Sequence, residues 1–496
     1  MFKTSKKEFV FELTFKIMYF VLVLISFNSI FAMQTYLTYI SFFITVFGAV
    51  VVLNRLTHIK DYINKYTIVL FLFLSSYFIS SIVMREYGIV ENAKAMVWMT
   101  IQYFILFATD KNKSSLEIKK EMDIISIIFI IYTFICSIVG ILMMFFNYGI
   151  YKIVNDVGIM AGFVDNRLWG VYSDPNYGAV FAVISIFLSI YYLKKLDKTI
   201  LKTGLIANII VEFLYICFSD SRTGKAAFIC SAFVFVFIKL YREGKIAVNK
   251  KEFYFSGVKK LFICTFYGLV IASLIFVSIP ATLKVANKIK VQDLNQVTGS
   301  IFIVNASTMD SNISISPNAL YKMETVQVKL DNDNMQIGRD RDKIKSENFT
   351  SNRFGIWKSA YEIFKTTPVV GTTFRHINDY AVKNLPETFL AQPGSDFHSM
   401  HNFLVDIMVS QGSIGLLLIF AFITFALKDV LTKVKYIKDD DYRLYCFVFS
   451  SLTAILVSMM FYSEAFYMNT GGAFLFWTFL GYILNSFLVA NKNEVK

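Results

Sequence analysis

The sequence lacks the common signatures of nucleotide-dependent, metal-dependent and serine-hydrolase enzymes. It contains no Walker loop, no Rossmann glycine pattern and no G-x-S-x-G elbow. Its five cysteines all fall inside apolar runs without C-x-x-C spacing, so neither a metal finger nor a disulfide framework is indicated. Its four histidines include no H-E-x-x-H pair, the arrangement of the helical zinc enzymes.

Charge is also scarce, and apolar residues take its place. Charged residues make up 17% of the chain, hydrophobic residues 56%, and the mean hydropathy is +0.54. The apolar residues occur in runs of roughly 17–25, the length that crosses a bilayer as a helix. Short alternating segments typical of a membrane barrel are absent. We therefore predict an all-α polytopic membrane protein.

Twelve membrane-spanning helices are predicted, with both termini in the cytoplasm. Their approximate ranges are Ile17–Phe31, Tyr36–Leu53, Thr67–Met84, Ala95–Ala108, Ile124–Phe146, Tyr177–Leu193, Ile200–Phe218, Ala226–Leu240, Leu261–Ile279, His401–Leu427, Tyr445–Phe461 and Gly472–Ala490.

The net charge of +13 raises the possibility of nucleic-acid binding, but its distribution indicates membrane topology instead. Lys and Arg concentrate in the segments between every second pair of apolar runs, as the positive-inside bias predicts. Specific recognition of anionic lipid is the alternative interpretation of the same charges. We predict a multi-pass protein of the cytoplasmic (inner) membrane that does not bind nucleic acid.

The long polar segment between the ninth and tenth helices divides the chain into three parts. Residues 1–279 hold helices one to nine, residues 280–400 form a large extracytoplasmic loop, and residues 401–496 hold the last three helices. Within the loop, residues 281–347 resemble a small irregular subdomain. From Ser351 onward, apolar residues recur at helical spacing, which predicts an amphipathic helix on the membrane surface.

A histidine stands where the polar loop meets the tenth helix. His401 is followed by Asn402, and a titratable imidazole at the water–lipid boundary is suited to proton transfer. Two other interpretations stay open: an interfacial histidine without a role, and a metal site with His376 and His398. The His398-x-x-His401 spacing does not match the i, i+4 pair of helical zinc enzymes, so we expect no metal.

Basic residues with anion-binding character precede the eighth helix. Ser221, Thr223 and Gly224 place hydroxyl and backbone N–H groups at a helix N-terminus, where anions bind. Arg222 and Lys225 add a guanidinium and an ammonium group there. The alternative is that Arg222 extends along the membrane edge into water. Arg353, at the start of the amphipathic helix, and Arg167, shortly before the sixth helix, are candidates for further clamps.

Because no nucleotide motif is present, the energy for any transfer must come with the substrate. A sugar linked to a lipid diphosphate is such a substrate, and it reaches the outer face within the membrane. We therefore predict a site that requires no metal and no cofactor.

Four sequence blocks resemble the O-antigen ligase/polymerase family of bacterial membrane proteins. They are Ser173-Asp-Pro-Asn-Tyr-Gly178; Ser221-Arg-Thr-Gly224; Arg353-Phe-Gly-Ile-Trp357 followed by Pro368-Val-Val-Gly371; and His401-Asn402 with Gln411-Gly-Ser-Ile-Gly415. The chain departs from the family in reading Gly371-Thr-Thr where the family often has Gly-x-Gly. The insertion 281–347 has no clear family counterpart.

The resemblance implies an inverting, metal-independent glycosyltransferase that acts on undecaprenyl diphosphate-linked glycans outside the cytoplasmic membrane. His401 matches the family's proposed catalytic base, and Arg222 and Arg353 match its diphosphate-binding arginines, with Lys225 beside them. Supporting roles are expected for further residues of the same blocks and their surroundings, namely Asn402, Arg167, Asp174, Asn176 and Ser221. The implied partners are the lipid-linked donor, a glycan acceptor and membrane lipids, with a chain-length regulator and a flippase as candidates.

The sequence leaves several functions open. A polymerase and a ligase differ only in the acceptor, and the Phe-, Ile-, Lys- and Asn-rich composition, typical of an AT-rich genome, weakly favours a polysaccharide polymerase. A twelve-span transporter is the rival from another class, although no internal repeat is visible and Glu212 is the main mid-span charge. A glycan sensor that uses the outer loop is a third possibility.

Overall fold

A computed structural model gives the arrangement of the chain in space. It describes residues 6–32, 34–154, 157–246, 250–293, 301–306, 323–328, 353–393, 397 and 399–494. Predicted features outside these ranges, including His398 and most of the segment 281–347, lie outside the described residues.

Helices dominate the structure, and every predicted span corresponds to one of them. Ten are long and apolar enough to cross a membrane by length and composition. The fourth predicted span is divided into an α-helix and a π-helical turn, and the twelfth is a shorter apolar stretch, Gly471–Asn485. The membrane helices are α1 (Lys6–Ser26), α2 (Thr35–Thr57), α3 (Lys65–Val83), α4 (Ile89–Ile101) with η2 (Gln102–Phe107), α5 (Ser115–Phe145), α6 (Pro175–Lys195), α7 (Thr199–Phe218), α8 (Arg222–Ile246), α9 (Lys250–Asp293), α13 (Phe403–Lys433), α14 (Asp439–Met459) and α15 (Gly471–Glu494).

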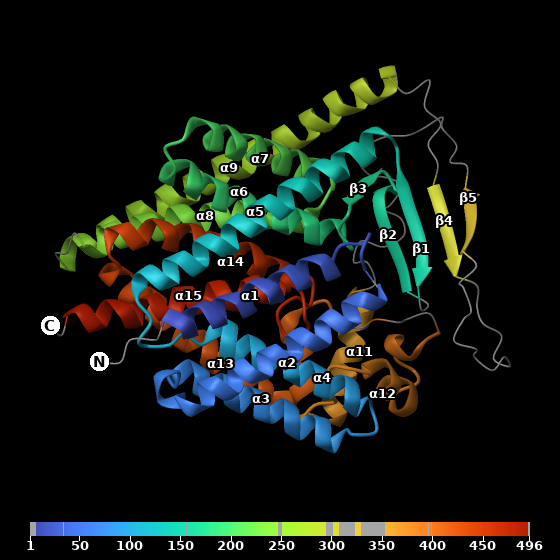
Figure 1. The fold of residues 1–496 in the computed structure, drawn as a ribbon, viewed down its shortest axis with the longest axis horizontal. Helices are drawn as coiled ribbons and strands as arrows, with labels where there is room; N and C mark the ends of the chain where they lie inside the picture. The colour runs from blue at the N-terminus through green and yellow to red at the C-terminus, as the bar shows by residue number, and fades with distance from the viewer. Residues whose placement is uncertain are drawn as a thin grey trace.

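The helices run roughly along one axis, and the remaining elements gather at one end (Figure 1). This end, called the sheet end below, carries the β-strands together with α11 (Arg353–Thr366) and α12 (Ile377–Asn384). The N- and C-termini lie at the opposite end of the bundle. A helix was predicted after Ser351, and α11 confirms it, whereas its place on the membrane surface stays a prediction.

Burial separates a central helix from lipid-facing ones. The apolar stretch of α6 is 83% buried, whereas those of α2 and α9 are 22% and 18% buried. Large apolar side chains such as Tyr39, Phe42 and Phe276 are exposed on these outer helices. In a membrane protein such side chains contact lipid, so α6 forms the core around which the site is built.

Local sequence explains where the site-bearing helices begin. Asp174 caps α6 by accepting hydrogen bonds from the backbone N–H groups of Asn176 and Tyr177, and Pro175 occupies the first helical position. Asn402 caps α13 through the N–H groups of Leu404 and Val405, at 3.0 and 3.2 Å. These caps fix the direction in which each helix leaves the sheet end.

A five-stranded sheet was not predicted from the sequence. Its order is β3-β2-β1-β4-β5, with β1 (Gly149–Val154), β2 (Val157–Val164) and β3 (Arg167–Gly170) in the predicted loop after the fifth span. The other two strands, β4 (Ile301–Ala306) and β5 (Met323–Val328), belong to the polar segment, and β4 runs parallel to β1. The prediction was incomplete because this parallel pairing joins segments far apart in the chain, which local patterning cannot reveal.

The ninth helix is longer than its apolar run. Pro280 was expected to open the polar segment, but it lies inside α9, which continues to Asp293. Proline removes one backbone donor without preventing a helix from continuing beyond it.

Helix α13 is interrupted at Gly412, and the segment that follows α11 binds to α13 at this interruption. Gly412 has φ 62° inside the helix, so the carbonyls of Val409 and Ser410 accept hydrogen bonds from Thr372 and Thr373, at 2.8 and 3.0 Å. Any side chain at Gly412 would approach the Val369 carbonyl oxygen to 2.4 Å. The Pro368–Gly371 and Gln411–Gly415 blocks therefore pack against each other.

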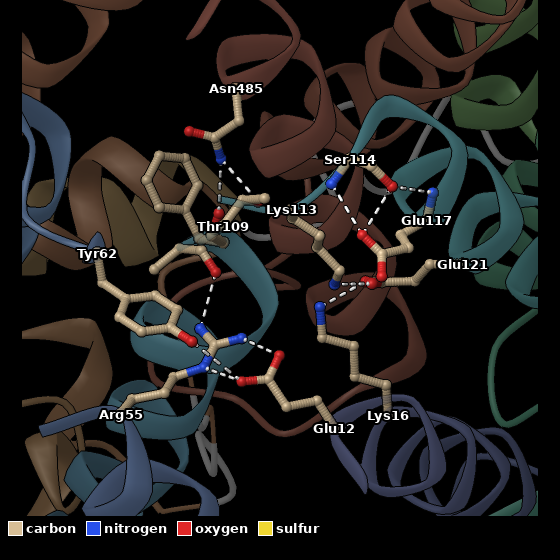
Figure 2. Close-up of polar contacts among 12 residues, drawn as sticks. Glu12, Lys16, Arg55, Tyr62, Thr109, Lys113, Ser114, Glu117, Glu121 and Asn485 are labelled. Carbon is tan, nitrogen blue, oxygen red and sulfur yellow. Dashed lines mark hydrogen bonds and ion pairs between the residues drawn. The ribbon is translucent and has the colours of Figure 1, made fainter. Parts of the chain in front are cut away.

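Buried ion pairs join the helices near the end opposite the sheet (Figure 2). Arg55 of α2 forms a bidentate pair with Glu12 of α1, and Lys16 and Lys113 both bind Glu121 of α5. All five side chains are almost fully buried. Because each charge has a partner, the network can be held inside the bundle.

Candidate active site

The first two sequence blocks meet at Asn176. Its side-chain oxygen accepts hydrogen bonds from Ser221 at 2.8 Å and from Arg167 at 3.3 Å. Its amide nitrogen donates to the hydroxyl of Tyr462 at 2.5 Å. Asn176 in the first turn of α6 thus connects β3, the start of α8 and the loop after α14.

Arg167 is a positioning residue in this geometry. Its guanidinium is 7% exposed and donates from Nε to the carbonyl of Ser219 at 2.9 Å. The bond fixes the turn before α8, where Ser221 accepts a hydrogen bond from the backbone of Gly224. We therefore expect Arg167 to orient the N-terminus of α8 as well as contribute charge.

The two basic residues at the start of α8 differ in their surroundings. Arg222 is exposed and forms no ion pair with any residue that the structure describes. Lys225 is bound to the largely buried carboxylate of Asp220 at 3.2 Å. Arg222 is thus available to an incoming anion, whereas Lys225 would have to share its charge with Asp220.

Arg353 and His401 both contact one aromatic ring, that of Tyr462. The Arg353 guanidinium carbon lies 5.8 Å from the ring centroid of Tyr462, and the imidazole of His401 lies 6.0 Å from that centroid with the two rings nearly perpendicular. Arg353 also donates to the backbone carbonyl of Phe461 at 3.4 Å. The structure thus brings the predicted base and one predicted clamp together.

His401 has the protonation properties of a base. Burial, followed by the positive charge of Arg353, lowers its pKa below the ordinary value, while Asp174 acts in the opposite direction. A lowered pKa keeps the imidazole neutral near pH 7. Its Nδ1 is buried without a hydrogen-bond partner among the described residues, so no described side chain fixes the tautomer of the ring.

The backbone at His401 is held in an unusual conformation. Its φ is 52°, in the left-handed region that non-glycine residues seldom adopt. The adjacent N–H of Met400 donates to Asp406 at 2.7 Å, and Asp406 also accepts from Ser463. Asn402 is committed to backbone groups, including the carbonyl of Met460 at 3.2 Å. These bonds position the histidine, and Asn402 supports it through the helix start.

Two further residues of this region were not predicted. Tyr462 contacts both Arg353 and His401, and Glu464 is the one charged residue between the last two predicted spans. Glu464 is 4% exposed, accepts from Ser458 at 2.5 Å and has its pKa raised to about 8 by burial and by nearby Asp174. An isolated acid in an apolar stretch was the signal that could have identified it.

The chain has Gly371-Thr-Thr where the family often has Gly-x-Gly, and the backbone angles at these positions are unusual. Gly371 and Thr373 both have positive φ, 72° and 71°. Thr373 therefore adopts the backbone conformation of the second glycine, and its hydroxyl oxygen accepts a hydrogen bond from Asn92 at 3.1 Å. A β-branched residue is strained there, and the bond to α4 offsets part of that cost.

The three described histidines, His58, His376 and His401, belong to no metal-binding group among the described residues. Among the residues that the structure describes, no group of three or more His, Cys, Asp or Glu side chains could hold a metal ion. His376 instead pairs with Asp379 at 2.6 Å, and His398 lies outside the described residues.

Taken together, the fold and the site define a polytopic α-helical membrane protein with an imidazole, a guanidinium group and a helix start that carries Arg222 and Lys225 at one end of its bundle. Residues 207–420 match the family model described as O-antigen ligase. This match supports the O-antigen ligase/polymerase family and confirms the resemblance carried by the sequence blocks, three of which it contains. No curated protein matches the chain. The family implies a lipid-linked glycan substrate and an acceptor in a membrane.

Proposed function

We propose that the protein is a glycosyltransferase that polymerises undecaprenyl diphosphate-linked oligosaccharide repeat units on the outer face of the cytoplasmic membrane. The product would be a capsular, exo- or O-antigen polysaccharide. The observation that carries the proposal is the meeting of neutral His401 and cationic Arg353 at the ring of Tyr462.

The reaction needs a base on one side and positive charge on the other. His401 takes the proton from an acceptor hydroxyl, and that oxygen attacks the anomeric carbon of the donor sugar. The bond from this carbon to the diphosphate oxygen breaks, which inverts the configuration. Arg353 and Arg222, with Lys225, offset the negative charge of the departing diphosphate, so these residues perform the role that a metal ion has elsewhere.

An apolar cavity supports the assignment of a lipid-linked donor. It has a volume of about 130 Å³, lies between α13, α14 and α15, and is lined by apolar side chains that include Phe403 and Met459. A cavity of this volume holds a group of about the size of one isoprene unit. Phe403 follows His401 by two positions, so we expect the cavity to take only the part of the polyprenyl chain next to the diphosphate, with the rest of the chain in lipid.

The orientation in the membrane follows from charge. The sheet end holds the site, and the basic segments fall between the helices at the opposite end, the side of both termini. Under the positive-inside bias, the sheet end faces outward. A flippase would supply the donor to that face, and a chain-length regulator would act on the product there.

The test is a deletion of the gene in its host, followed by complementation with variants. His401→Ala and Arg353→Ala should each abolish long polymer, while His58→Ala and Arg85→Ala serve as matched controls. Both control side chains are exposed, and neither is placed in the site. Full polymer length in both site variants would contradict the proposal.

The same deletion distinguishes a polymerase from a ligase. Loss of a polymerase leaves single repeat units on undecaprenyl diphosphate, because none are joined. Loss of a ligase leaves long lipid-linked chains that are not transferred. The lipid fraction of the deletion strain, separated by mass, reports which substrate accumulates.

A further inference from the structure

A second cavity, lined by both apolar and polar side chains, lies beside the candidate active site. It has a volume of about 530 Å³ and is lined by residues of α4, the segment 374–379, Phe397, Tyr467 and Asn469. This volume is within the range of about 300–1,000 Å³ typical of small-molecule sites. The Phe397 ring lines the cavity and lies 6.0 Å from the imidazole of His401.

The cavity and the predicted diphosphate-binding residues contact different rings beside His401. The centroid of the imidazole lies 6.0 Å from that of Phe397 and 6.0 Å from that of Tyr462. Arg353 and Asn176 lie at Tyr462, whereas the cavity lies at Phe397. An acceptor bound in the cavity would thus lie near the imidazole without occupying the place of the diphosphate beside Arg353.

The lining is suited to a sugar. Trp98 offers a partly exposed aromatic ring, whereas the rings of Phe374 and Tyr467 are stacked at 4.9 Å, are each 1% exposed and form part of the cavity wall. The C–H faces of a pyranose pack on such rings, while amides such as that of Asn469 can bond hydroxyl groups. This mixture of rings and a few polar groups is typical of a small-molecule site.

Arg375 adds a positive charge that forms no ion pair with any carboxylate among the described residues. Its guanidinium is half-buried, donates to the sulfur of Met468 at 3.8 Å and forms no ion pair with any described residue. Two carboxylates line the cavity, those of Glu91 and Asp379. Their oxygens lie 3.8 Å from Nε2 and 2.6 Å from Nδ1 of His376, respectively. Lys94 likewise has no ion-pair partner in the described part of the chain.

A half-buried guanidinium needs an anion to offset its loss of hydration. Burial lowers the pKa of Arg375, and Tyr77 and Glu91 only partly oppose this effect. Sulfur is a weak acceptor, so the strongest donors of Arg375 are left for a ligand. Carboxylate and phosphate groups match the planar fork of a guanidinium.

We propose that this cavity binds the acceptor glycan and that Arg375 recognises an acidic group, carboxylate or phosphate, on a sugar of that glycan. The identification of the bound glycan as the acceptor rests on the proposed function, whereas the existence of the binding site does not. Lys94 at the cavity mouth strengthens the attraction of acidic glycans.

The test measures binding of three small probes to the purified full-length protein in detergent. Glucuronate supplies a carboxylate, glucose 6-phosphate supplies a phosphate, and glucose is the neutral control. Trp98 lines the cavity, so its fluorescence should change on binding and the change should disappear in Trp98→Phe. Binding of glucuronate alone indicates a carboxylate on the natural glycan, and binding of glucose 6-phosphate alone indicates a phosphate.

Variants then test the role of the charge. Arg375→Met should weaken acid binding at least about tenfold, because charge-assisted hydrogen bonds are lost. Lys94→Met, at an exposed position that tolerates substitution, should give a smaller loss. Arg85→Met, outside the cavity, should bind like the unmodified protein.

Two results would overturn the proposal: glucose binding as tightly as both acids, or acid binding that is undiminished in Arg375→Met and Lys94→Met. Failure of the proposed function is distinguishable, because His401→Ala should retain acid binding while losing polymer. Polymer formation by His401→Ala would reject the catalytic assignment without affecting this binding site.

Discussion

The charge of Arg353 should be measurable in the pH dependence of the reaction. Arg353 and His401 lie 5.8 and 6.0 Å from the same point, the ring centroid of Tyr462, so they are separated by no more than about 12 Å. Two unit charges at that distance interact by about 0.3 kcal/mol in water and about 1.4 kcal/mol at a protein dielectric of about 20. These energies correspond to about 0.3 and 1 pKa unit.

The direction in which the pH profile shifts follows from the protonation form of the imidazole that reacts. A base must be neutral, so kcat/KM falls when the pH drops below the pKa of His401. Arg353 lowers that pKa, so Arg353→Met should raise it and move the acidic limb of the profile to higher pH by about 0.3–1 unit. The rate should also fall by about 10²–10³ because one charge facing the diphosphate is lost.

The control is Arg353→Lys, which keeps the charge and loses the bidentate geometry. Its rate should fall, while its acidic limb should stay near that of the unmodified protein. The measurement is kcat/KM for lipid-linked donor between about pH 5 and pH 9, with each profile normalised to its plateau. An acidic limb that stays in place in Arg353→Met, or moves equally in both variants, would refute the reasoning.

Three further predictions concern stability, measured as thermal unfolding in detergent. Glu464 has its pKa raised from 4.5 to about 8, so the folded state binds its proton more tightly than the unfolded state does. The stability should therefore decline as the pH rises from about 4.5 to 8, and Glu464→Gln should remove most of this decline. Gly412→Ala should be strongly destabilising because of the contact with a backbone carbonyl, whereas Gly204→Ala, with open space around it, should stabilise α7 by about 0.5–1 kcal/mol. Arg55→Ala should cost about 3–5 kcal/mol, since Glu12 would be left as an unpaired buried charge.

The membrane helices could be predicted because their signal is local. An apolar run of sufficient length with basic residues at one end specifies a spanning helix whatever its neighbours are, as α2, α5 and α13 illustrate. The residue types of the site were also visible, because His401 and Arg222 stand at the ends of such runs and Arg353 stands at the start of the predicted amphipathic helix. The family match over 207–420 covers all three residues.

What holds those residues together depends on contacts between distant segments. Asn176 bonds Ser221 and Tyr462 across 45 and 286 positions of the chain. No periodicity or spacing encodes such a pairing, so Tyr462 and Glu464 were missed as site residues. The parallel pairing of β1 with β4 was missed for the same reason.

The sequence by itself determined the membrane class, the helical form of the apolar runs and which polar residues lie at their ends. Each of these properties depends on the hydration of residues that are neighbours in the chain. Only the tertiary structure decided that His401 and Arg353 share the ring of Tyr462, that Asn402 serves the helix start, and that Arg375 enters a cavity beside the imidazole. Those properties depend on burial and on the distances between charges, which exist only once the helices have packed.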